Sequence, residues 1–370
     1  MNNRLEMKLN TIEELIADIR DGRMVVVMDD EDRENEGDLI MAAEKVTPEA
    51  VAFFVRYTSG IICQPMLRER LEELRLPQMV PDNTEAHRTA FTISVDYRHG
   101  TTTGISAHDR ARTIRALADP TSRPEDFARP GHIFPLRYAE GGVLRRAGHT
   151  EATVDLVRAA GLAPTGILCE IVNDDGTMKR GGELVAFARE HGLKIGTIAD
   201  LIRWRLERER TIERLAECEM PTEYGPFRAC AYRDLVAGHV HLALVRGPIT
   251  AERPALVRVH VQNTLSDVLG VVWDELGWPV RDALRRIAAE GGVLIVLRGQ
   301  ETDAALVQWF GEGRREAETH DEAAVLRTYG VGAQILADLG VRRMRVLSAP
   351  KKMHGISGFG LEIVEYVDRA

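Results

Sequence analysis

Apolar and polar positions change period along the first half of the chain, and these changes predict helices interleaved with strands. Thr11 begins a T-I-E-E capping box, which predicts a helix that runs to Ile19. The continuous apolar run Met24–Met28 is typical of a buried strand. This alternation favours an α/β (α+β) domain, a mixed sheet with helices on its faces, over a helical bundle. Further helices are expected at 48–57, 110–118, 150–160 and 183–191, and further strands at 60–63, 90–95, 166–172 and 194–198.

A second α/β domain is expected after a charge-dense stretch. Residues 200–219 are predicted to form a long helix, which ends at Met220 and Pro221. We place the domain boundary within it, so that the domains span residues 1–208 and 209–370. The polar, acid-rich span 302–319 is expected to be a loop or an exposed helix. Apolar runs restart at 240–245, 256–261, 293–297 and 344–347.

Length and composition agree with two globular domains. The chain has 370 residues, more than one hydrophobic core usually spans, and its net charge is −9. An acidic chain is a poor binder of polyanions, so we expect neither nucleic acid nor an anionic membrane as a partner. The start of the chain has no apolar signal region and no stretch is long enough to span a membrane, which predicts a cytoplasmic protein.

The four cysteines do not suggest a disulfide framework or a thiolate metal site. They stand at positions 63, 169, 218 and 230, without a C-x-x-C pair. Cys63 and Cys169 lie in apolar segments, and we interpret both as small core residues rather than nucleophiles.

The segment Asp29–Asp38 is the strongest chemical signal. All of its residues except Arg33, Asn35 and Gly37 are carboxylates, and it lies between two apolar runs. So many like charges in a loop at the edge of a core lower the stability of the fold unless cations neutralise them. Hard divalent metals with oxygen ligands fit that need, although the spacing is not that of an EF-hand. Arg33 offers a planar donor for a phosphate or a sugar hydroxyl. The ordinary alternative is a solvated charged face.

Other polar residues stand where core strands are expected to end. His132 is expected in a rigid turn, and Glu170 ends an apolar strand in the position of a working acid or base. Thr150 is a candidate N-cap, which would make an anion site beside Arg146 and place His149 to ligate a metal. Each residue taken alone is more often structural, but together they favour a metal-dependent enzyme.

Six motifs in one order resemble the 3,4-dihydroxy-2-butanone 4-phosphate synthase family, over about residues 9–205. They are DDEDRENEGD, SGIIC, TTTGISAHDR, RPGHIFPL, RRAGHTEATVDL and ILCEIVNDDGTM. The resemblance implies D-ribulose 5-phosphate as the substrate, and 3,4-dihydroxy-2-butanone 4-phosphate and formate as the products, in riboflavin biosynthesis. It also implies two Mg²⁺ (or Mn²⁺) ions and a homodimer with sites near the subunit interface.

The resemblance also implies roles for single residues. Glu34 and His149 would hold metal, and His132 and Glu170 would transfer protons. Ala147 departs from the usual R-G-G-H-T motif, which is tolerated if its φ is negative. Glu36, Cys63 and Thr103 would line the catalytic site, and the sugar phosphate would contact Arg33, Glu34, Asp38, Arg146, Ala147, Gly148, His149, Thr150 and Glu170.

This chemistry agrees with the residues. Proton removal beside a ketone gives an enediolate, and divalent metal stabilises that developing charge. Three alternatives remain. A sugar-phosphate isomerase would share the enediolate but would not release formate, phosphoryl transfer would lack the usual GxxxxGK[ST] loop, and a non-catalytic metal module would leave His132 and Glu170 unexplained.

Residues from about 220 resemble GTP cyclohydrolase II, but the catalytic pattern is incomplete. No cysteine occurs between Val261 and Arg298, where that family has three zinc ligands. Val325 stands where a catalytic aspartate is expected, two residues before Arg327. We therefore expect no zinc and no GTP cyclohydrolase II activity, and a structural or nucleotide-sensing role. The alternative is a bifunctional enzyme that retains this activity.

Overall fold

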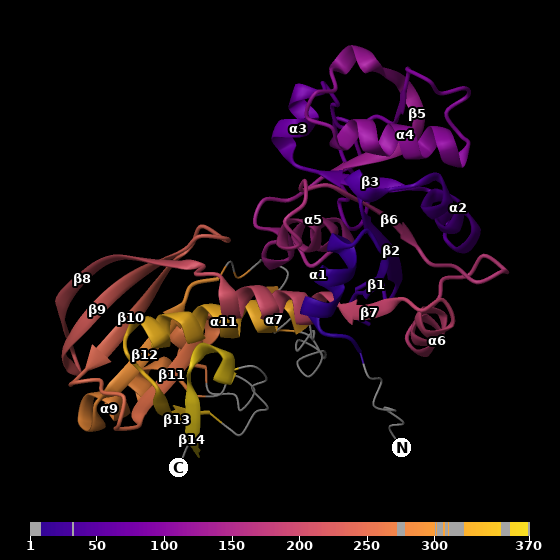
Figure 1. The fold of residues 1–370 in the computed structure, drawn as a ribbon. Helices are drawn as coiled ribbons and strands as arrows, with labels where there is room; N and C mark the ends of the chain where they lie inside the picture. Colours follow the sequence, from indigo (N-terminus) through magenta and orange to yellow (C-terminus); the bar gives the residue numbers. More distant parts are fainter. Residues whose placement is uncertain are drawn as a thin grey trace. The chain divides into compact units, whose positions relative to one another are not determined.

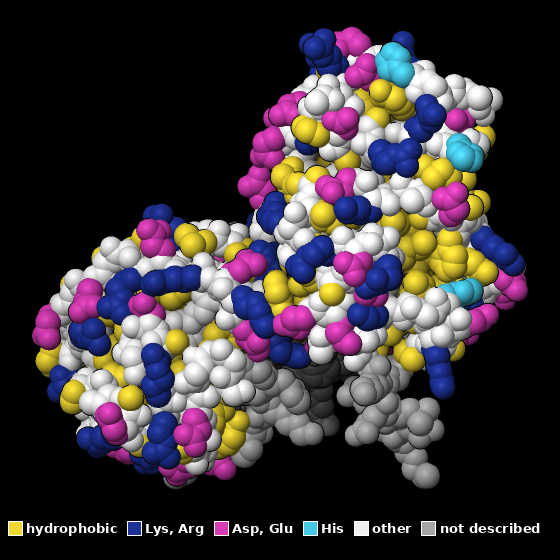
Figure 2. All heavy atoms as spheres, in the orientation of Figure 1, with side chains coloured by type: hydrophobic (Ala, Val, Ile, Leu, Met, Phe, Trp, Pro, Cys, Tyr) yellow, Lys and Arg dark blue, Asp and Glu magenta, His cyan; other side chains and the backbone are white. Residues whose placement is uncertain are grey.

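The computed structural model divides the chain into two compact units, Met1–Ile202 and Arg203–Ala370 (Figure 1). The structure describes residues 9–31, 33–271, 278–299, 301, 306–307, 310, 322–348 and 356–368. None of the helices in these residues combines the length and the apolarity that a membrane span requires. Acidic and basic side chains are interspersed over the face of the molecule that Figure 2 shows.

The first unit is built on a mixed seven-stranded sheet in the order β4-β5-β3-β6-β2-β1-β7. β1 and β3 each have one parallel and one antiparallel neighbour, as the sequence predicts for a mixed sheet. The strands are β1 (Val25–Met28), β2 (Gly37–Ala42), β3 (Cys63–Met66), β4 (Val95–Tyr97), β5 (Phe127–Arg137), β6 (Gly166–Glu170) and β7 (Lys194–Thr197).

Helices pack on this sheet, and the strand pleat decides which side chains they meet. Leu39 of β2 belongs to a core that also contains Phe54 and Ile114. Successive strand residues point to opposite faces, so Asp38 points to the other face, on which α5 packs against β2. The helices are α1 (Ile12–Arg20), α2 (Pro48–Tyr57), α3 (Arg68–Glu73), α4 (Ala107–Ala118), α5 (His149–Ala159), α6 (Gly182–Glu190) and α7 (Ile198–Arg208).

The second unit has its own mixed seven-stranded sheet, in the order β14-β13-β11-β12-β10-β9-β8. The four apolar runs of the sequence form its β10, β11, β12 and β13, and α11 packs on them to make one core. The strands are β8 (Ile212–Thr222), β9 (Gly225–Asp234), β10 (Val240–Arg246), β11 (Ala255–Val261), β12 (Gly292–Leu297), β13 (Arg343–Leu347) and β14 (Glu362–Val367), and the helices are α8 (Thr264–Asp267), α9 (Val280–Glu290) and α11 (Glu322–Asp338).

Some predicted elements are confirmed and others are wrong. The Thr11 capping box is present at the start of α1. The predicted helix over 200–219 is confirmed as far as Arg208, where α7 ends, and is wrong beyond it, because residues 212–222 form β8. β8 is an edge strand with mostly exposed side chains, so its charges alone do not distinguish it from a solvated helix.

The strands predicted at 60–63 and 90–95 are both displaced, since β3 begins at Cys63 and β4 at Val95. Residues 91 and 92 form only isolated bridges. The predicted span 302–319 lies outside the described residues, except at 306–307 and 310.

Candidate functional site

Polar side chains from several strands collect at one end of the first sheet. Asp38 of β2 pairs with Val27 of β1 on one side and with Glu170 of β6 on the other. Cys63 of β3 pairs with Leu168 of β6 and with Phe134 of β5. Glu170 lies two residues after Leu168, and His132 lies two residues before Phe134, so both positions fall level with Ile61. Neighbouring strands lie about 4.8 Å apart, which places the β6 and β5 positions about 10 Å apart across this end.

The acidic segment folds into a tight turn around Asp29, which the sequence did not single out as a ligand. The Asp29 carboxylate accepts hydrogen bonds from the backbone N–H of Glu36 at 2.9 Å and of Glu34 at 3.1 Å, and from the guanidinium of Arg33 at 2.8 Å. Asn35 adopts a left-handed conformation, with φ of 54°, which asparagine tolerates. The turn directs the Glu34 side chain toward α5.

His149 stands at the first position of α5 and faces these carboxylates. Its Nδ1 lies 3.7 Å from Oε2 of Glu34 and 3.8 Å from Oδ1 of Asp38. Its Nε2 lies 3.1 Å from the carbonyl oxygen of Val27, so Nε2–H donates there and Nδ1 faces the acids. Ligand atoms of Asp29, Glu34 and His149 all lie within 4.8 Å of one another, a set that suits a metal ion.

Burial and the excess of carboxylates set the charges of this cluster. Burial acts to raise the pKa of Glu34, but His149 and Arg33 outweigh it and lower that pKa to about 2. Burial raises the pKa of Asp38. Burial acts to lower the pKa of His149, but the carboxylates of Asp38, Glu34 and Asp29 outweigh it, and that pKa is raised. Without an ion the cluster therefore retains protons, which a divalent cation would displace.

Asp38 gives a direct test of whether the site fits a cation. Its Oδ1 is buried and has no hydrogen-bond partner in the described part of the chain. A buried carboxylate oxygen without a donor is costly, and a hard cation supplies the missing partner. The ligand set of Asp29, Glu34 and His149, two carboxylates and one imidazole, is also the kind that Mg²⁺ and Mn²⁺ accept.

Glu170 ends β6, as the sequence predicts, and a hydroxyl orients it. The Oγ of Ser59 donates to Oε2 of Glu170 at 2.6 Å. Burial, together with the charges of Glu34 and Glu170, raises the pKa of nearby Glu36. Sequence reasoning did not identify Ser59, because a serine before a glycine signals only a turn.

His132 lies within the long strand β5, at an irregularity, and not in the turn that the sequence predicts. The register between β4 and β5 shifts between Val95 and Asp96. Asp96 then faces His132, with Oδ2 at 2.7 Å from Nδ1 of the ring. Thr103 lies on the exposed loop that follows β4.

The segment before α5 differs from its predicted geometry at one residue. The N-cap of α5 is Gly148, and Thr150 is buried inside the first turn, so the predicted Thr150 cap is wrong. Arg146 donates to Glu151 at 2.8 Å and to the Thr89 hydroxyl at 3.0 Å. The φ angle of Ala147 is not positive, which explains why alanine is tolerated at this position.

Both thiols near the site are protonated at neutral pH. Burial raises the pKa of Cys63 above its ordinary value and that of Cys169 to about 12. A buried neutral thiol packs and does not attack, which agrees with Cys63 as a lining residue.

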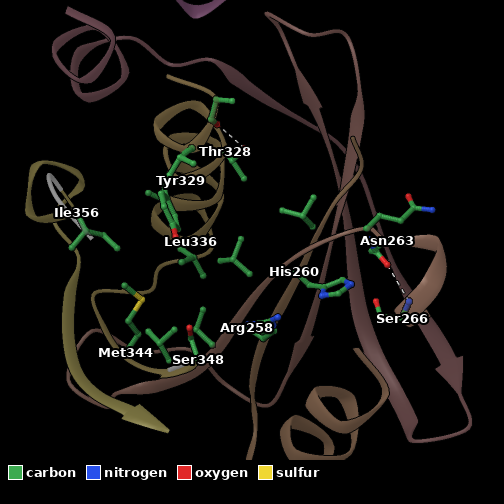
Figure 3. Close-up of a pocket in the computed structure, with 18 residues that line it drawn as sticks. Arg258, His260, Asn263, Ser266, Thr328, Tyr329, Leu336, Met344, Ser348 and Ile356 are labelled. Atoms are coloured by element: carbon green, nitrogen blue, oxygen red, sulfur yellow. Dashed lines mark hydrogen bonds between the residues drawn. The ribbon is translucent and has the colours of Figure 1, made fainter. Parts of the chain in front are cut away.

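The second unit holds a cavity of about 470 Å³ between β11, α11 and β13 (Figure 3). Its lining is mainly apolar, but Arg258, His260 and Tyr329 border it. Burial lowers the pKa of Arg258 to about 10, and its guanidinium donates to two backbone carbonyls. The Nε2 of His260 lies 2.8 Å from Oδ1 of Asp267, so these two side chains pair with each other beside the cavity. Val325 also lines this cavity.

Two family profiles match the chain, one for each unit. Residues 13–204 match 3,4-dihydroxy-2-butanone 4-phosphate synthase, and residues 213–368 match GTP cyclohydrolase II. A 3,4-dihydroxy-2-butanone 4-phosphate synthase of Pseudomonas aeruginosa is 52% identical over 364 residues, which cover 98% of this chain and 99% of that protein. The riboflavin biosynthesis protein RibBA of Aquifex aeolicus is 48% identical over 381 residues, covering 99% and 94%.

Two solved structures are also similar. RibBX, a two-domain 3,4-dihydroxy-2-butanone 4-phosphate synthase from A. baumannii, superposes with a TM-score of 0.83 at 44% identity, covering 98% of this chain and 100% of that one. A 3,4-dihydroxy-2-butanone 4-phosphate synthase in complex with two magnesium ions has a TM-score of 0.53 at 50% identity, covering 54% of this chain and 98% of that one.

Proposed function

This chain belongs to the 3,4-dihydroxy-2-butanone 4-phosphate synthase family of riboflavin biosynthesis enzymes, and we propose that its first unit converts D-ribulose 5-phosphate to 3,4-dihydroxy-2-butanone 4-phosphate and formate. The observation that carries the proposal is the row of Asp38, Glu170 and His132 at one sheet end, beside the Glu34–His149 pair. Acids and imidazoles in that arrangement suit a reaction made of proton transfers and oxyanion stabilisation.

We propose that Glu34 and His149 hold two Mg²⁺ (or Mn²⁺) ions, with Asp29 as a further ligand. The buried, unpartnered oxygen of Asp38 and the retained protons of the cluster support this assignment. Bound metal would stabilise the enediolate charge of the sugar as it develops. The similar structure that contains two magnesium ions agrees with this stoichiometry.

The protein side chains supply the proton chemistry and the binding contacts. Glu170, oriented by Ser59, is the base that removes a proton from the sugar, and His132 transfers protons in the dehydration and rearrangement that follow. The buried thiol of Cys63, together with Glu36 and Thr103, lines the reacting carbons.

The phosphate-binding contacts are assigned to the start of α5. The N-terminus of that helix carries a partial positive charge, and Gly148 at the N-cap leaves its N–H groups open to an anion. The sugar phosphate contacts would come from Arg33, Arg146, Ala147, Gly148 and Thr150.

Formate detection tests the proposal. The full-length protein with Mg²⁺ and ribulose 5-phosphate should release one formate per four-carbon product, whereas an isomerase would give a pentose and no formate. A protein that consumed the sugar without formate would contradict the proposal. Assay of residues 1–208 would show whether the second unit is required.

For the second unit we propose a structural or regulatory role without GTP cyclohydrolase II catalysis. The absence of cysteine between Val261 and Arg298 removes the thiolates of a catalytic zinc site, and Val325 lines the cavity where an acid is expected. Retention of a cavity favours a ligand-sensing form of this role. The purified chain with Zn²⁺ and GTP should release no formate, and formate release from GTP would overturn the proposal in favour of a bifunctional enzyme.

We also propose that the protein is a homodimer, since the family resemblance places sites near a subunit interface. Light scattering of the purified chain would test this, and a mass near 41.2 kDa, that of one chain, would contradict it.

A further inference from the structure

The imidazole of His132 is held from one side by a single carboxylate. Oδ1 of Asp96 accepts the backbone N–H of His132 at 2.9 Å, and Oδ2 lies 2.7 Å from the ring Nδ1. An ionised carboxylate only accepts hydrogen bonds, so Nδ1 carries the proton in the neutral ring. Nε2 is then left with its lone pair, and the hydrogen bonds of the described residues include none donated to it.

The carboxylate itself is fixed by close packing of backbone. Gly131 brings β5 so near to β4 that a Cβ atom there would lie 2.0 Å from the carbonyl carbon of Val95. On the other side, a Cβ on Gly104 would lie 2.0 Å from Oδ2 of Asp96. Two glycines therefore allow the backbone to close around Asp96, which leaves little freedom to its side chain.

The loop that contains Gly104 is anchored independently. Asp109 accepts hydrogen bonds from the Thr102 hydroxyl at 2.8 Å and from the Gly104 N–H at 3.2 Å. Asp109 is buried at the start of α4, so the loop is tied to a helix. The same loop carries Thr103, so Asp96 lies between two segments that the proposed function assigns to the site.

The geometry points to Asp96 as a positioning residue for His132. It holds the imidazole in the Nδ1–H tautomer and in one orientation, so that Nε2 is the atom that accepts a proton from the sugar and returns it. This assignment rests on the proposed function of His132. It names the group that sets the tautomer and the orientation of the His132 imidazole.

Nuclear magnetic resonance of the ¹⁵N-labelled full chain tests the tautomer separately from activity. The chain has eleven histidines, so comparison with His132→Asn assigns the His132 signals. We expect the Nδ1–H form in the wild type and a shift toward Nε2–H in Asp96→Asn. A wild-type ring in the Nε2–H form, or an unchanged tautomer in Asp96→Asn, would overturn the inference.

Kinetics supply the second readout. Asp96→Asn should lower kcat about a hundredfold and leave KM within about twofold, and Asp96→Glu should restore part of kcat. Asp126→Asn is the matched control, because His99 pairs with Asp126 at 3.0 Å on an exposed surface, and it should leave kcat unchanged. A normal kcat in Asp96→Asn would overturn the positioning role, whereas a normal rate in His132→Asn would instead overturn the proposed function.

Discussion

Asp38 and Glu170 stand directly opposite each other across the antiparallel β2–β6 ladder. Opposed residues of such a ladder share a face with Cβ atoms about 5 Å apart, so two carboxylates meet at the centre of the site. Burial raises the pKa of Asp38, and the charge of Glu170 adds to the rise. This repulsion is relieved by a proton in the ion-free protein, and by a cation when one binds.

Mg²⁺ should therefore stabilise the protein. An ion that binds only the folded state at about one hundred times its Kd adds about 2.7 kcal/mol to the free energy of unfolding. We expect a higher thermal midpoint of the wild type with Mg²⁺, and a much smaller rise for Glu34→Gln. Glu72→Gln, on an exposed face of α3, is the control and should keep the full rise. An equal rise in Glu34→Gln would show that the ion binds elsewhere.

Glu170→Gln should abolish formate release while the protein remains folded. The amide keeps the shape of the side chain but cannot take a proton, so we expect a loss of about a hundredfold or more in kcat. Ser59→Ala removes the hydroxyl that lies 2.6 Å from Glu170 and should cause a smaller loss of kcat. Circular dichroism and the formate assay check both variants, and normal turnover in Glu170→Gln would exclude it as the base.

Gly131→Ala should disturb the site through the backbone. The new methyl group would collide with Val95, and relief requires that β4 and β5 move apart, which we expect to cost about 1–3 kcal/mol of stability. Gly182→Ala is the matched control, since a Cβ there meets nothing within 4 Å and the residue begins helix α6. Thermal midpoints of both variants test the difference, and equal midpoints would contradict the packing argument.

The sequence predicts what local pattern controls. Short-range periodicity identifies α1, β1 and the strand that ends in Glu170, and the acidic segment predicts a cluster of candidate metal ligands because like charges beside a core need a counterion. The edge strand β8 is missed because most of its side chains are exposed, so no buried apolar face distinguishes it from a solvated helix.

Partners that lie far apart in sequence are not predictable in this way. Asp96 and His132 are 36 positions apart, and only the register shift between β4 and β5 brings them together. Asp29 is one carboxylate among many in its segment, and its inward direction depends on the turn that its own oxygens stabilise. Tertiary geometry selects these two residues, and composition does not.

A partly buried hydrogen-bond network in the second unit gives a stability prediction. Asp338 at the end of α11 accepts hydrogen bonds from the Tyr232 hydroxyl at 2.8 Å and from Arg214 at 2.7 Å. Tyr232 is fully buried, so Tyr232→Phe leaves one acceptor position without its donor, and we expect a loss of about 1–2 kcal/mol. All four tryptophans lie beyond residue 202, so their fluorescence in a urea titration reports the unfolding of this unit.

The same network makes the stability of this unit depend on pH. Burial acts to raise the pKa of Asp338, but the hydrogen bonds from Arg214 and Tyr232 outweigh it, and the pKa is lowered. A carboxylate with a lowered folded-state pKa stabilises the fold above its unfolded value of about 3.9, and this contribution is lost as the pH falls through the folded value. Asp338→Asn should therefore be less stable than the wild type at pH 7, and the difference should shrink below about pH 4. The exposed Asp368→Asn should match the wild type at both pH values, and a difference for Asp338→Asn that stayed constant with pH would show that its charge contributes nothing.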